Sequence, residues 1–139
     1  MKTLIKFYNS KYFPRLFCKR SDGGDKSGVT AYFLIEWKIL FSIGVLKFNK
    51  GSREAFHSHA FNALTWWVKG CVTEVKIDGT HTDYSASLKP KYTSRQNTHK
   101  VIAHKTTYAL TFRGPWNDTW TEVRNGKTVI LTHGRKQIG

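Results

Sequence analysis

The distribution of apolar residues along the chain is that of short β-strands. Segments 29–37 and 38–48 are dense in β-branched and aromatic residues and lack the capping residues and polar stripe of a surface helix. Segment 71–77 alternates apolar and polar residues, which is typical of a strand with one buried face. Further strands are expected at 61–68, 81–88, 98–103, 106–112, 119–124 and 127–132. No segment has the pattern of a helix.

Turn signals separate the expected strands. Asp78-Gly79 follows one strand, and Asn125-Gly126 lies between the last two. Asn-Gly readily adopts the positive φ angles that a two-residue hairpin turn requires. Eight or more short strands joined by such turns predict an all-β sandwich or barrel.

Length and composition narrow the class of protein further. The 139 residues make one domain, and their 14% of aromatic residues argues against a disordered chain or a coiled coil. Cys18 and Cys71 are too few for a disulfide scaffold and lack the paired spacing of zinc ligands. The chain shows neither a signal peptide nor an apolar run long and uncharged enough to cross a bilayer. We therefore expect a soluble, cytoplasmic protein with no membrane partner.

The charge of the chain is strongly positive. Twenty-three Lys and Arg against nine Asp and Glu give a net charge of +14, which favours anionic partners such as nucleic acid, acidic proteins or phosphorylated metabolites. Seven of the basic residues lie in segment 1–28, which ends in a turn-rich run. We interpret 1–28 as a basic arm or an extra edge strand, for which Leu4–Tyr8 is a candidate. Residues 29–139 form the expected β-domain.

Two histidines suggest a metal site. His57 and His59 are separated by one residue, so on a strand their side chains point to the same face, about 6.6–7 Å apart. Two imidazoles so placed can converge on one metal ion. A third ligand must then come from elsewhere in the fold. A His-x-His pair is a weak signal alone, because either ring can be an ordinary loop histidine.

The residues around this pair carry a family resemblance. The spacing Gly51-x5-His57-x-His59-x3-Ala63-x6-Gly70 resembles the first motif of the cupin superfamily. Ala63 stands where that motif has its acidic ligand. Glu54 and Glu74 are the nearest carboxylates, and neither has the position to replace it.

A closer resemblance spans residues 31–123 and is to small, mostly uncharacterised cupin proteins of bacteria and their phages. The matching residues are Tyr32-x-Leu34-x2-Trp37, Lys47-Phe48, His57-x-His59-x-Phe61, Gly70-x-Val72-x-Glu74, His99-Lys100-Val101, Leu110-x-Phe112-x-Gly114-Pro115 and Trp120. Pro90 followed by His99 resembles a degenerate second cupin motif, with longer spacing and without the expected Gly. The resemblance implies a single-domain jelly-roll β-barrel with a metal site inside. It implies no particular reaction.

Strand parity predicts which residues share the interior. Phe61, Ala63, Thr65 and Trp67 follow His59 at even spacing and should face the same way. His99 and His104 are five residues apart, so only one of them can join the pair, and His99 has the better context.

We therefore expect His57, His59 and His99 to hold a divalent transition metal. The candidates are Fe, Zn, Ni, Mn and Cu, of which Fe, Zn, Ni and Cu suit imidazole, and the sequence does not choose among them or exclude a metal-free barrel. Three neutral imidazoles leave the charge of the ion uncompensated, which favours an anionic ligand. Arg113, Trp67 and Tyr108 are the candidate ligand-binding residues. Arg113 would bind a carboxylate or phosphate as a fork-shaped donor.

Two functions of different classes follow. In the first, the barrel is a metal-dependent cupin that binds or transforms a small anionic ligand by oxygenase-, isomerase- or hydrolase-type chemistry. In the second, the barrel is a basic, non-enzymatic scaffold that engages nucleic acid or an acidic host protein. A homodimer that pairs through sheet edges, with a strand from the N-terminal segment, is compatible with both.

Overall fold

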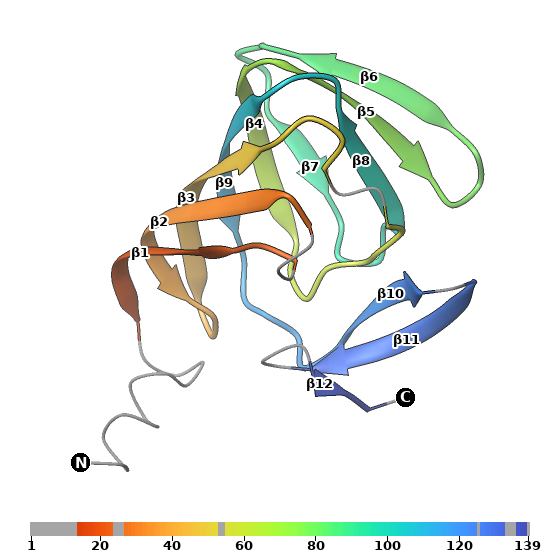
Figure 1. Ribbon diagram of the computed structural model, residues 1–139. Coiled ribbons are helices and arrows are strands. Elements are labelled where there is room, and N and C mark those ends of the chain that lie inside the picture. The colour runs from red at the N-terminus through yellow and green to blue at the C-terminus, as the bar shows by residue number, and fades with distance from the viewer. Residues whose placement is uncertain (1–13, 24–26, 53–54, 125, 133–135, 139) are drawn as a thin grey trace.

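The computed structural model describes residues 14–23, 27–52, 55–124, 126–132 and 136–138, and these form strands without any helix (Figure 1). The strands are β1 (Arg15–Ser21), β2 (Val29–Trp37), β3 (Phe41–Phe48), β4 (Ala63–Lys69), β5 (Cys71–Lys76), β6 (His81–Ser85), β7 (Lys91–Thr93), β8 (His99–Ala103), β9 (Thr107–Arg113), β10 (Trp120–Arg124), β11 (Lys127–Thr132) and β12 (Lys136–Gln137). The all-β prediction is confirmed. In this part of the chain nothing helical exists that could cross a membrane.

Most of the expected strands lie where the apolar pattern placed them. The β2 strand covers the expected 29–37, and β10 and β11 form the hairpin predicted around Asn125-Gly126, with Gly126 at φ +77°. The candidate edge strand Leu4–Tyr8 lies outside the described residues. The structure has an edge strand further along, because β1 pairs antiparallel with β2 from Arg15↔Glu36 to Ser21↔Thr30.

Two sheets enclose the interior. One has six strands in the order β1-β2-β3-β9-β4-β7, and the other has three in the order β6-β5-β8 (Figure 1). Their facing sides supply the buried apolar cluster, which consists of Val29, Ala31, Phe33, Leu46, Phe48, Trp67, Val72, Val101, Ala103 and Ala109. The third sheet, β10-β11-β12, lies below the other two in the view of Figure 1. The β2, β3 and β9 strands alternate buried and more exposed residues, as one-sided burial requires.

One glycine of the cupin-like spacing has a clear structural reason. Gly70 connects β4 to β5 with φ +103°, a conformation that disfavours any side chain. A Cβ at this position would collide with the side chain and the backbone of Thr107. The chain therefore needs glycine here both for the turn and for the close approach of β9.

Candidate metal centre

The segment that carries His57 and His59 is held between two strands. It lies in the connection between β3 and β4 rather than in a strand, which differs from the expectation for the pair. On one side, His57 N–H donates to the His99 carbonyl at 2.8 Å, and His99 N–H donates back at 3.0 Å. On the other side, Ser58 N–H donates to the Thr121 carbonyl at 2.9 Å. The first strand of the C-terminal hairpin and the start of β8 thus fix the position of the histidine pair.

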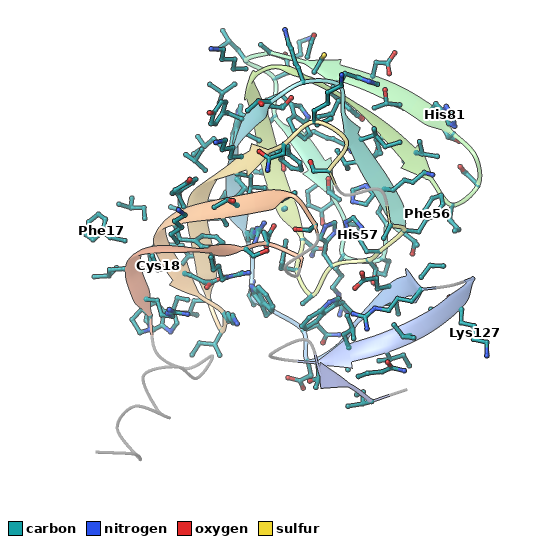
Figure 2. All side chains as sticks on the ribbon, viewed as in Figure 1. Phe17, Cys18, Phe56, His57, His81 and Lys127 are labelled. Atoms are coloured by element: carbon teal, nitrogen blue, oxygen red, sulfur yellow. The ribbon has the colours of Figure 1, made fainter. Side chains whose placement is uncertain are left out.

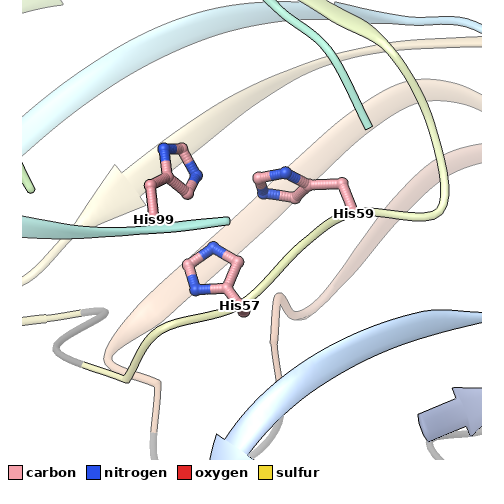
Figure 3. Close-up of side chains that lie close together, drawn as sticks. All are labelled: His57, His59 and His99. Carbon is pink, nitrogen blue, oxygen red and sulfur yellow. The ribbon is translucent and has the colours of Figure 1, made fainter. Parts of the chain in front are cut away.

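Three imidazole rings meet inside the barrel. The ring centroids of His57 and His59 are 4.8 Å apart, and both lie about as far from His99, at 5.0 and 5.1 Å. One nitrogen from each ring lies within 4.8 Å of the others. Figure 3 shows the rings turned toward a common point, with His99 reaching across from β8. His57 and His99 are buried, and His59 is half-buried.

Hydrogen bonds orient two of the three rings. Nδ1 of His57 donates to the Ala55 carbonyl at 2.8 Å, and Nδ1 of His99 donates to Glu74 Oε2 at 2.5 Å. In each ring the bond uses Nδ1, so Nε2 is the nitrogen that can coordinate an ion. A carboxylate or carbonyl behind a ligating imidazole is the usual way in which proteins fix its tautomer and raise its basicity.

Glu74 is a functional residue that the sequence reasoning did not assign. It is 1% exposed on β5 and accepts hydrogen bonds from His99, Lys91 and Asn97. Burial alone would raise the pKa of the Glu74 carboxyl, but the hydrogen bonds from His99 and Lys91 and the charge of Lys91 outweigh burial and lower it to about 2. The carboxylate is therefore ionised behind His99. A signal was present, because Glu74 is two residues after the buried Val72 on β5 and therefore faces the same side, toward the interior.

A cavity of about 70 Å³ opens beside the three rings. Its walls include Phe61, Ala63, Thr65 and Trp67, the four residues that parity assigned to the face of His59. Ala63 leaves the position of the cupin acidic ligand without a carboxylate. Glu74 also lines the cavity, but its Oε2 accepts the hydrogen bond from Nδ1 of His99, and Glu54 lies outside the described residues.

The comparisons with known proteins address the fold. No protein-family model and no curated protein matches the sequence. An RmlC-like cupin from Shewanella frigidimarina has a TM-score of 0.55 and 17% identity over 68% of this chain and 81% of its own. A conserved protein with a double-stranded β-helix domain from Klebsiella pneumoniae has a TM-score of 0.58 and 14% identity, over 76% and 90%. A sugar phosphate isomerase from a cupin superfamily, from Silicibacter pomeroyi, has a TM-score of 0.53 and 10% identity over 91% of both chains.

The chain has the cupin fold. At 10–17% identity these neighbours establish the architecture, and the resemblance drawn from the Gly and His spacing is confirmed at that level. The position of the histidine cluster inside this cupin fold comes from the geometry of the chain itself. Together the fold and the three imidazoles, two of them buried, make a candidate metal site.

The predicted ligand-binding residues occupy different places in the cupin fold. Trp67 and Arg113 line the cavity, whereas Tyr108 does not. Tyr108 and Arg113 are five residues apart on β9, so they face opposite sides of the sheet, and Tyr108 lies on the outer side with Leu110 and Phe112. The parity argument that separates His99 from His104 also separates this pair.

Arg113 is buried on the cavity wall, beside a carboxylate of the chain itself. It is 3% exposed, and its guanidinium donates to both carboxylate oxygens of Asp22, at 2.7 and 3.3 Å. The same group lies 4.4 Å from the centroid of the Phe61 ring. Asp22 follows β1, so the N-terminal strand contributes a wall of the cavity.

The remaining histidines lie away from the cluster. His104 is exposed and shares a 2.6 Å hydrogen bond with Thr73 Oγ1, and His81 is exposed on β6 (Figure 2). His133 lies outside the described residues.

The donor set fits a divalent transition metal. Three imidazoles from two separate segments present nitrogens to one point, and two of the rings have their tautomers set by acceptors behind them. The nitrogen separations of up to 4.8 Å are wider than those around one ion with bonds of about 2.0–2.1 Å, so small ring rotations would complete the site.

Proposed function

We propose that the chain is a metal-binding cupin in which His57, His59 and His99 hold one divalent transition ion and the adjoining cavity takes a small anionic ligand. The observation that carries the proposal is the convergence of the three rings beside a cavity, with Nδ1 of His99 fixed by Glu74 at 2.5 Å. Three protein ligands leave coordination positions open, which is the arrangement of catalytic rather than structural metal sites.

The charges of the cavity wall support an anionic ligand. Its described charged side chains are Asp22 and Glu74 against Lys91 and Arg113, so the charges balance when the imidazoles are neutral. A bound divalent ion would then add two uncompensated positive charges in a partly enclosed space. Such a site attracts an anion more strongly than a site with two histidines and one carboxylate, because Ala63 contributes no negative charge.

Polar atoms on the cavity wall could orient that ligand. Within the described part of the chain, Trp67 Nε1 and Arg113 Nε are buried donors without a hydrogen-bond partner. Both residues line the cavity. Buried donors are normally satisfied, so a ligand oxygen is a suitable acceptor for each. Asp22 binds the two terminal nitrogens of the Arg113 guanidinium, which leaves Nε to donate to a ligand.

When bound, the ion would act as a Lewis acid and a template for water, oxygen or substrate. Of the candidates Fe, Zn, Ni, Mn and Cu, imidazole favours Fe, Zn, Ni and Cu. The chain itself would fix the histidine tautomers and enclose the ligand. The positive charge of the site would balance the negative charge of the ligand. We propose the reaction class only as far as oxygenase-, isomerase- or hydrolase-type chemistry on a small anion.

Elemental analysis of protein purified without a polyhistidine tag tests the proposal. We expect one transition-metal ion per chain in the wild type and loss of that ion in His57→Ala and His59→Ala. His104→Ala is the matched control, because His104 is exposed and outside the cluster. Metal that persists in both cluster variants, or wild-type protein that does not take up any of the five metals on reconstitution, would refute the proposal.

A further inference from the structure

The carboxylate of Asp22 reaches the cavity from outside the segment that resembles cupins. Asp22 directly follows β1, the edge strand of the six-stranded sheet (Figure 1). The resemblance begins at residue 31, so β1 precedes it in the chain. Asp22 nevertheless lines the cavity together with Phe61 and Arg113. The N-terminal strand therefore adds a negative charge to the wall of the candidate site.

Both the backbone and the side chain hold Asp22 in place. Its N–H donates to the Val29 carbonyl at 2.9 Å, and its own carbonyl accepts a hydrogen bond from Ser27 Oγ at 2.6 Å. Its Oδ2 accepts from Nη2 of Arg113 at 2.7 Å. Its Oδ1 accepts from Nη1 of Arg113 at 3.3 Å and from Nη1 of Arg20 at 3.4 Å. The side chain is only 14% exposed, so the carboxylate has a defined position on the cavity wall.

Asp22 is part of a network of four charges that sums to zero. Arg20 also donates to Glu36, which is 2% exposed, from Nε at 3.1 Å and from Nη2 at 2.5 Å. The signs therefore alternate from Glu36 through Arg20 and Asp22 to Arg113. Buried charges are normally paired in this way, because burial of an unpaired charge is costly. As a result, the positive charge of Arg113 is already compensated by the chain.

The histidine cluster and the Asp22–Arg113 pair contact the same aromatic ring. The ring centroids of His59 and Phe61 are 5.3 Å apart, and the Arg113 guanidinium lies 4.4 Å from the centroid of Phe61. A ligand bound at the cluster would therefore extend along Phe61 toward the pair. A metal ion would make the histidine end of the cavity positive, whereas the Arg113 end contains a compensated pair.

The strand register places this pair beside the position of the missing acidic ligand. Arg113 on β9 is the Cα partner of Ala63 on β4, and both residues line the cavity. A carboxylate at position 63 would reduce the charge of the ion. The chain instead has its carboxylate on Asp22, where it reduces the charge of Arg113. The two arrangements therefore favour ligands of different charge.

We propose that Asp22 is a specificity-determining residue that selects ligands with a single anionic group. The inference rests on the proposed function, because the metal ion would bind that group. A second carboxylate or phosphate at the Arg113 end would need the two terminal nitrogens that Asp22 occupies, and it would lie against a like charge. A neutral hydroxyl or carbonyl oxygen needs one donor, which Nε of Arg113 can supply. The ligand class is thus a small monoanion with a neutral oxygen at its other end.

Calorimetric titration of the zinc-loaded full chain with two four-carbon acids tests this inference. The acid 4-hydroxybutyrate has one carboxylate and a terminal hydroxyl, whereas succinate has two carboxylates. We expect the wild type to bind 4-hydroxybutyrate more tightly than succinate. Asp22→Asn leaves the charge of Arg113 uncompensated, so the affinity for succinate should rise about tenfold or more, the effect of one hydrogen bond between charged groups. The affinity for 4-hydroxybutyrate should change much less.

Two control variants separate charge selection from a structural role. Asp22→Glu keeps the carboxylate, and Asp83→Asn removes an exposed carboxylate that does not line the cavity. Both should keep the preference for 4-hydroxybutyrate. A structural role of Asp22 alone would change the thermal unfolding of Asp22→Asn and leave the ratio of the two affinities unchanged.

Two results would overturn the inference and leave the proposed function intact. The first is tighter binding of succinate than of 4-hydroxybutyrate by the wild type, a measurement that does not depend on the folding of any variant. The second is a folded Asp22→Asn whose ratio of affinities equals that of the wild type. If neither acid binds the zinc-loaded wild type or Asp22→Asn, the anion site of the proposed function is refuted, and the inference is refuted with it.

Discussion

Nδ1 of His99 on β8 donates a hydrogen bond to Oε2 of Glu74 on the paired strand β5, at 2.5 Å. This bond fixes the tautomer of the third histidine of the cluster. Replacing Glu74 with Gln removes the charge while keeping the shape of the side chain. We expect metal affinity to fall about 10- to 100-fold, the usual effect of losing such a partner, as measured by competition with a chelator.

Asp83→Asn is the matched control for the Glu74 variant. Asp83 is an exposed carboxylate on β6 that accepts a hydrogen bond from Thr73 and lies outside the cluster. We expect its metal affinity to equal that of the wild type. Equal affinities for Glu74→Gln and the wild type would show that the carboxylate does not support the ligand.

The same carboxylate makes stability depend on pH in a defined window. The pKa of Glu74 is about 2 in the folded chain and near 4.5 when unfolded, so the folded state favours the ionised form. Its contribution to the free energy of unfolding is therefore complete above about pH 4.5 and declines as pH falls toward 2. Urea unfolding of the metal-free wild type should show this decline, and Glu74→Gln should show a shallower one. Parallel pH profiles would contradict the assignment.

Strand assignment and interior parity were predictable from the sequence because both depend on local alternation. The even spacing from His59 to Trp67 placed Phe61, Ala63 and Thr65 on the cavity wall, as observed. The spacing did not predict that His57 lies in a connection rather than in a strand. The hydrogen bonds that hold this connection come from Thr121 and His99, far along the chain. Local pattern carries no information on such partners.

Long-range ion pairs escaped prediction for the same reason. Asp22 and Arg113 are 91 residues apart in the sequence and meet only in the folded chain, across the cavity side of the six-stranded sheet. Arg113 was expected to bind a carboxylate or phosphate of a ligand, whereas its terminal nitrogens bind the carboxylate of the chain's own Asp22. Glu74 was set aside because the family position for the acidic ligand is that of Ala63, and its role behind His99 depends on the pairing of β5 with β8.

Two glycines with similar backbone angles separate conformational strain from steric contact. Gly70 and Gly79 have φ of +103° and +91°, so alanine at either position costs about 1–2 kcal/mol for the left-handed backbone. Only at Gly70 would the new Cβ meet Thr107, and overpacking adds about 1–3 kcal/mol. Denaturant unfolding should therefore find Gly70→Ala clearly less stable than Gly79→Ala. Equal losses of stability would contradict the close approach of β9.

Restoring a carboxylate at Ala63 tests the charge argument for an anionic ligand. Ala63→Glu would place a negative charge on the cavity wall beside the histidine cluster. We expect metal affinity to rise and the affinity of the metal-loaded protein for malonate to fall, because the site loses one unit of positive charge. Calorimetric titration of both proteins measures the two effects. Malonate affinity that is unchanged or higher in the variant would contradict the argument.

Anomalous diffraction at the absorption edge of the reconstituted metal tests the central claim most directly. The account predicts one strong anomalous peak per chain, at about 2.0–2.1 Å from a nitrogen of each of His57, His59 and His99. A metal peak elsewhere in the chain, or full metal loading with no peak among the three rings, would contradict it.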